Sequence, residues 1–154
     1  MCVRNCSWMY PYHFILTIST RGLHLGGNAH LKGIPMAESE KSQIIATVTD
    51  YLEGIRDGDS ARIANAFYSS VNLNSVDRDG NLVLTPRSVL ETLATSGTLP
   101  PNSSEITHIE INNDMALVKV TIDMPTLNYH DLLTLLRLNV GWKIVGKTYT
   151  TVMK

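Results

Sequence analysis

The stretch DLLTLLRLNVGWKIVGKTYT, residues 131–150, consists of two apolar runs separated by a short break at Asn139, Val140 and Gly141. The first run also has helical propensity, but the break and the second run favour a hairpin of two strands. Strict alternation then puts Trp142, Ile144 and Gly146 on one face and Lys143, Val145 and Lys147 on the other. We interpret Trp142 as a packing residue that fixes the hairpin.

Two more alternating runs precede this hairpin, SSEITHIEI at 103–111 and MALVKVTIDM at 115–124. The tight turn between them falls at Asn112, Asn113 and Asp114. Because short turns join antiparallel neighbours, the second half of the chain is predicted to form a four-strand antiparallel meander.

The first half carries three helical patterns and one short hairpin. We expect a helix from Ser39, as N-cap, to Gly58, and a second one capped by Asp59. A third should follow Thr85 as N-cap and end at Gly97, after a hairpin that turns around residues 78–81. The expected apolar stripe of the first helix is Ile44, Ile45, Val48, Leu52 and Ile55. The fold class is therefore α+β, with helices gathered on one face of a curved sheet.

Composition excludes several partners. The chain has 154 residues, a formal net charge of −1 and 18% charged residues, so no excess of basic charge points to nucleic acid. No apolar run reaches the roughly 18 residues of a membrane span. Residues 36–154 contain no cysteine. We therefore expect no nucleic-acid or membrane partner and a cytoplasmic location.

Residues 1–35 differ from the rest of the chain. They hold both cysteines and three basic residues but no acid, and they show no sustained period. Three interpretations stay open: an upstream stretch read from a mis-assigned start before Met36, a targeting segment, or an ordered extension. We expect a non-native or disordered extension over 1–35 and one domain over 36–154. The codons for Lys-Gly-Ile-Pro-Met permit a bacterial ribosome-binding site before Met36.

The order of elements, with the stretches TVTDYLEGIRDGDSARIANAF, ITHIEINNDMALVKV and HDLLTLLRLNVGWKIVGKTY, resembles the nuclear transport factor 2-like superfamily. Within it, the chain is most similar to the SnoaL-like and putative lumazine-binding group. The resemblance covers about residues 40–150. It implies a cone-shaped roll with three N-terminal helices packed on a curved, mostly antiparallel sheet. It also implies an open apolar mouth and a homodimer formed through the outer face of the sheet.

Related enzymes place a carboxylate or a His–Asp pair in that mouth, where apolar surroundings raise the pKa of a carboxylate. The candidate catalytic residues here are Asp131 and His108, and the candidate ligand-binding residues are Tyr51, Tyr129 and Arg137. Asp131 shares a strand face with Tyr129 and Arg137, so Arg137 is expected to neutralise it or bind an anion. His108 is expected to share a face with Ile106 and Glu110. Each of these residues also has a purely structural interpretation.

No His, Asp or Glu set after Met36 has the spacing of a metal site, and no nucleophile or phosphate-binding motif is present. We expect neither metal nor cofactor. The first hypothesis is a binding or accessory protein for a small hydrophobic or cyclic ligand. The alternative is a cofactor-free isomerase, cyclase or dehydratase that acts by general acid–base chemistry. A role in protein–protein interaction is the third.

Overall fold

The computed structural model describes residues 36–154, with side chains described from Glu40 onward. The expectations for 1–35 lie outside the described residues. Three helices precede and interrupt the sheet: α1 (Met36–Asp57), α2 (Ser60–Ala66) and α3 (Arg87–Thr95). The strands are β1 (Asn72–Val76), β2 (Leu82–Pro86), β3 (Ser103–Asn112), β4 (Met115–Asp123), β5 (Leu127–Leu138) and β6 (Gly141–Met153).

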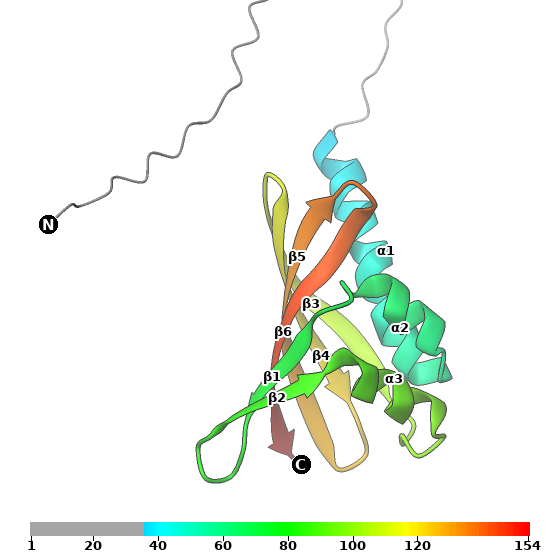
Figure 1. The fold of residues 1–154 in the computed structure, drawn as a ribbon, viewed down its shortest axis with the longest axis vertical. Helices are drawn as coiled ribbons and strands as arrows, with labels where there is room; N and C mark the ends of the chain where they lie inside the picture. Colours follow the sequence, from blue (N-terminus) through cyan, green and yellow to red (C-terminus); the bar gives the residue numbers. More distant parts are fainter. Residues whose placement is uncertain (1–35) are drawn as a thin grey trace, which may run out of the picture. The chain divides into compact units, whose positions relative to one another are not determined.

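The six strands form one sheet in the order β2-β1-β6-β5-β4-β3. All neighbours are antiparallel except β1 and β6, which pair in parallel. The helices lie on one face of the curved sheet, as Figure 1 shows. The expected α+β roll is thus confirmed, and 131–150 forms two strands rather than a helix.

Local chemistry explains where the helices end and begin. Gly58 adopts a positive φ of 72° directly after α1, a conformation that costs glycine little. The Asp59 side chain then accepts from the backbone N–H groups of Ala61 and Arg62 at the start of α2, as the sequence predicted. Two expected caps are wrong: α1 begins at Met36 rather than after Ser39, and Thr85 lies in β2 while Pro86 holds the N-cap position of α3.

The core lies between the helices and the inner face of the sheet. From α1 it takes Ile44, Val48, Tyr51, Leu52 and Ile55, which are all buried. Ile45, expected on the same stripe, is 38% exposed, and Tyr51 is the residue that completes the inner face instead. Trp142 is buried beneath α1, and its carbonyl accepts from Thr47 Oγ1 at 3.3 Å.

Two β-bulges change the inward and outward alternation of the sheet. In β6, Thr134 pairs with Gly146 while Leu135 pairs with Ile144, so Val145 is an extra residue. In β3, Ile106 pairs with Val120 while His108 pairs with Lys119, which leaves Thr107 extra. Each extra residue shifts the following side chains to the opposite face. Lys147 therefore shares the face of Ile144 and Gly146 does not, contrary to the expectation. His108 shares a face with Glu110, as expected, but not with Ile106.

Candidate functional site

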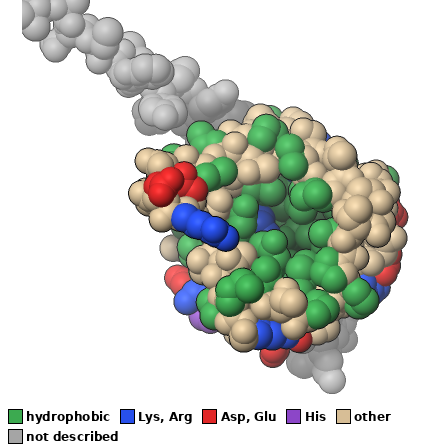
Figure 2. Space-filling view, turned by 90° about the horizontal axis from the view of Figure 1, so that it is seen from below, with side chains coloured by type: hydrophobic (Ala, Val, Ile, Leu, Met, Phe, Trp, Pro, Cys, Tyr) green, Lys and Arg blue, Asp and Glu red, His purple; other side chains and the backbone are tan. Residues whose placement is uncertain are grey.

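An apolar cavity of about 110 Å³ opens at the end of the domain where helix α3 and the β1–β2 hairpin lie. Seen from that end, hydrophobic side chains surround a hollow with a basic side chain visible inside it (Figure 2). Its apolar walls come from α1, α3, the sheet and the loop after α3, and consist of Ile55, Leu73, Val89, Leu90, Leu93, Leu99, Ile122 and Met124.

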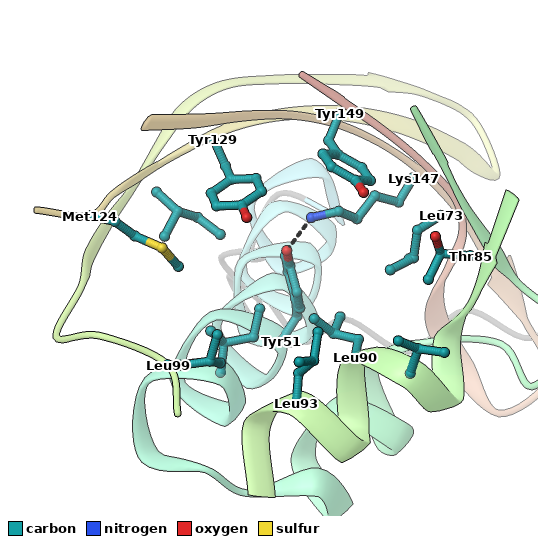
Figure 3. A pocket seen from close by; sticks show the side chains of 13 residues that line it. Tyr51, Leu73, Thr85, Leu90, Leu93, Leu99, Met124, Tyr129, Lys147 and Tyr149 are labelled. Carbon is teal, nitrogen blue, oxygen red and sulfur yellow. Dashed lines mark hydrogen bonds between the residues drawn. The ribbon is translucent and has the colours of Figure 1, made fainter. Parts of the chain in front are cut away.

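The polar side chains of the lining gather on the sheet side of the cavity. They are Tyr51, Thr85, Tyr129, Lys147 and Tyr149, and Figure 3 shows Lys147 between the rings of Tyr129, Tyr149 and Tyr51. Lys147 is the one Lys, Arg, Asp or Glu among the described residues that line the cavity.

Lys147 is positioned by the bulge in β6. In a strand without a bulge, the alternation that starts from the inward Ile144 would point Lys147 away from the core. With the bulge, Lys147 joins the face of Ile144, and it is only 5% exposed. Its pairing with Leu73 of β1 places it near the middle of the sheet. The curved sheet thus carries a basic side chain inward to the base of an apolar cavity.

The ammonium of Lys147 is held by two side chains. It donates to the carboxylate Oδ2 of Asp131 and to the hydroxyl oxygen of Tyr51. Tyr51 in turn donates to the same Oδ2 at 2.7 Å. Asp131 is 3% exposed, and its Oδ1 has no hydrogen-bond partner within residues 36–154. The three side chains form one closed group, in which each contacts the other two.

Aromatic rings complete the surroundings of this group. Lys147 Nζ lies 4.8 Å from the centroid of the Tyr51 ring and 5.3 Å from that of Tyr149, within the range of cation–π attraction. The Tyr129 and Tyr149 rings are 5.9 Å apart. Tyr51 also packs edge-on against Phe67, with centroids 5.2 Å apart. These contacts fix the tyrosines around the ammonium group.

Burial shifts the ionisation of this group. Loss of water lowers the pKa of Lys147, while the nearby Asp131 carboxylate opposes that shift. The pKa of Tyr51 is raised well above its usual value, first by burial and then by the charge of Asp131. Burial also raises the pKa of Tyr129. Both phenols are therefore neutral hydrogen-bonding groups near neutral pH.

The sequence-predicted candidates separate into two sets. Tyr51 and Tyr129 line the cavity, and Asp131 lies at its base behind Lys147 and Tyr51. Their roles in binding or catalysis stay predictions.

The other two candidates lie elsewhere. The bulge at Thr107 turns His108 outward, where its side chain is 51% exposed beside Glu110. Arg137 is six residues along β5 from Asp131, roughly 20 Å away at strand spacing, and pairs with Glu40. Both expected site placements are wrong.

Sequence reasoning missed Lys147, which is the cation that pairs with Asp131 in place of Arg137. The available signal was Gly146, because a glycine inside a strand often marks a bulge. Among the described residues, no cluster of three or more His, Cys, Asp or Glu side chains could hold a metal ion. No helix in the described part of the chain is long and apolar enough to cross a membrane.

An open cavity between three helices and a curved sheet is the architecture expected of the nuclear transport factor 2-like superfamily. The sequence profile of the putative lumazine-binding family matches residues 39–150, so the chain belongs to that family. The resemblance inferred from the sequence is confirmed. No curated protein matches the chain.

Solved structures share the fold. A nuclear transport factor 2-like protein of unknown function from Shewanella baltica OS155 is 25% identical, with a TM-score of 0.68 over 75% of this chain and 95% of that one. Another from Silicibacter pomeroyi DSS-3 is 19% identical, with a TM-score of 0.66 over 75% and 98%. A putative dehydratase of the same family from Streptomyces avermitilis is 15% identical, with a TM-score of 0.57 over 77% and 99%. At such identities, the last two show the fold alone.

Proposed function

We propose that this protein binds a small, mainly apolar ligand, whose polar end contacts Lys147. The observation that carries the proposal is a buried ammonium group at the base of an otherwise apolar cavity. Ligand sites combine apolar walls with a few convergent polar groups in this way. The lining leucines and Met124 suit the body of the ligand, while Lys147, Tyr129 and Tyr149 suit a hydrogen-bonding end.

Native mass spectrometry of the purified full chain tests this proposal. Gentle ionisation should preserve a discrete added mass that leaves on activation, and the family description makes lumazine the first compound to add. Leu90→Phe, which fills the cavity, should reduce binding at least about tenfold. Val140→Phe, at the exposed β5–β6 turn, is the matched control and should bind normally. Equal binding by both variants would contradict the assignment of the site.

A cofactor-free enzyme is the second candidate, and one observation favours it. Asp131, Tyr51 and Lys147 form a hydrogen-bonded group that connects a buried carboxylate with the cavity. Lys147 and Tyr129 could stabilise an oxyanion that develops on a ligand held there. Incubation with 2-indanone in D₂O checks this: enzyme-dependent deuterium uptake next to the carbonyl supports it, and uptake equal to that of a Lys147→Met variant speaks against it.

We propose that two copies associate through the outer face of the sheet. Leu132 and Leu136, on the outward side of β5, are 39% and 37% exposed. Exposed leucines on an outer sheet face support an interface there. Light scattering should show a dimer, and Leu132→Glu with Leu136→Glu should yield a monomer. Val140→Glu, on the turn, is the control.

The cytoplasmic location also stays a prediction. It is supported by a domain, 36–154, that contains no cysteine and so needs no oxidising compartment to fold. Immunoblotting of cytosolic, periplasmic and membrane fractions checks it, and recovery outside the cytosol would contradict it.

A further inference from the structure

We propose that the cavity selects neutral ligands that present a carbonyl oxygen to Lys147, and that Asp131 sets this selectivity by neutralising the ammonium charge. This inference rests on the proposed binding function and names its ligand class. It starts from the charges at the base of the cavity, where one cation faces one carboxylate and both are almost completely buried.

The hydrogen-bonding capacity of Lys147 leaves room for one acceptor. An ammonium group has three N–H donors, and the described contacts of Lys147 use two, one to Asp131 and one to Tyr51. Since Lys147 lines the cavity, the third donor can reach a ligand oxygen there. In Figure 3, the hydroxyl of Tyr129 lies on the same side of the cavity, where it can donate to that oxygen as well.

The charge at this position favours an uncharged acceptor. The Lys147–Asp131 pair carries no net charge, so toward the cavity it acts as a dipole with its positive end exposed. Such a dipole attracts the partial negative charge of a carbonyl oxygen. A carboxylate ligand would lose its hydration in the apolar cavity without meeting an unpaired cation, and burial of such a charge is costly.

Asp131 is therefore a positioning residue that acts through Lys147. It does not line the cavity, and its Oδ2 accepts from both Lys147 and Tyr51. If Asp131 lost its charge, Lys147 would lack a counter-ion, and an anionic ligand could supply one. Asp131→Asn keeps the shape of the side chain and an acceptor oxygen, so its effect reports the loss of the negative charge.

Three probes of similar shape test this: acetophenone, benzoate and ethylbenzene, titrated against the full chain by NMR at about pH 7. We expect wild type to bind acetophenone at least about tenfold more tightly than either other probe. Asp131→Asn should shift the ratio toward benzoate by about tenfold or more. Lys147→Met combined with Asp131→Asn should abolish the preference for acetophenone over ethylbenzene. The double variant gives this test even if Asp131→Asn alone fails to fold.

The contrary outcomes are distinct. Benzoate binding as tight as acetophenone binding in wild type would overturn the inference and leave the proposed function intact. An unchanged ratio in folded Asp131→Asn would overturn the role of Asp131. A preference for acetophenone that survives in the double variant would overturn the role of Lys147. If no probe binds saturably to wild type, both the inference and the proposed function fail.

Discussion

Lys147 and Asp131 lie 16 residues apart in the sequence and meet as a buried ion pair on adjacent strands of one sheet. Their side chains are 5% and 0% exposed, and Tyr51 bonds to both. The carboxylate and the ammonium group each need the other, because both are almost completely buried. This dependence defines what substitutions at the site should do.

Removal of the cation alone should destabilise the protein strongly. Lys147→Met leaves Asp131 buried with Tyr51 as its single side-chain donor among residues 36–154, which should lower the free energy of unfolding by about 3–5 kcal/mol. Lys147→Met combined with Asp131→Asn should recover at least half of that loss, because no charge is then buried. Urea unfolding followed by circular dichroism measures both. A double variant as unstable as the single one would contradict a dominant charge effect.

The stability of the fold should decrease at high pH through Tyr51. The pKa of this phenol is raised in the folded protein, so the unfolded chain loses the proton first, from its usual value of 10.0 upward. The contribution of Tyr51 is complete below about pH 10 and is lost as the pH rises toward the folded pKa. Thermal unfolding between about pH 8 and 11 should show a shallower decline for Tyr51→Phe. Tyr68→Phe, at an exposed tyrosine, should decline like wild type.

The bulge that positions Lys147 requires a small residue at 146. A Cβ at Gly146 would lie 2.5 Å from Thr134 Oγ1 on the neighbouring strand. Gly146→Ala should therefore cost about 1 kcal/mol and weaken ligand binding, since Lys147 is the next residue. Adding Thr134→Ala removes the contacted oxygen and should restore stability. Chemical denaturation of the single and double variants checks this, and an equal loss in both would show that the contact is irrelevant.

The start of α2 depends on its cap. Asp59 Oδ1 accepts from Ala61 N at 3.0 Å and from Arg62 N at 3.1 Å. Asp59→Ala should destabilise the domain by about 1 kcal/mol, while Asp59→Asn should be close to wild type because it keeps the acceptor. Urea midpoints of the two variants decide this. Comparable losses would point to the charge of Asp59 rather than its cap.

The positions of His108 and Arg137 away from the cavity carry their own prediction. His108→Ala and Arg137→Ala should each leave ligand affinity within about twofold of wild type, because neither residue lines the cavity. Tyr129→Phe removes a hydroxyl from the cavity and should weaken binding of an oxygen-bearing ligand several-fold. NMR titration with acetophenone compares the three variants. A large loss of affinity in the His108 or Arg137 variant, with none in the Tyr129 variant, would show that the ligand binds outside this cavity.

The sequence by itself determined the elements and their order. Helical spacing, the Gly58–Asp59 junction, the turns around Gly80, Asn113 and Gly141, and strand alternation are local properties, because each depends on residues close in the chain. The inward position of Asp131 followed from the same alternation. The parallel pairing of β1 with β6 did not, since no local pattern specifies which distant strand a segment joins.

Only the tertiary structure decided which charged residue accompanies Asp131. Alternation predicts Lys147 outward and His108 inward, and one extra residue in each strand reverses both. A bulge forms where strand curvature and packing on the helices favour it, and those forces act between segments far apart in the sequence. The sheet register pairs Lys147 with Leu133, which makes Asp131 its diagonal neighbour on β5, and it leaves Arg137 at the far end of β5, beside Glu40. The chemistry of the cavity thus depends on the one-residue bulge at Val145, which alternation alone does not reveal.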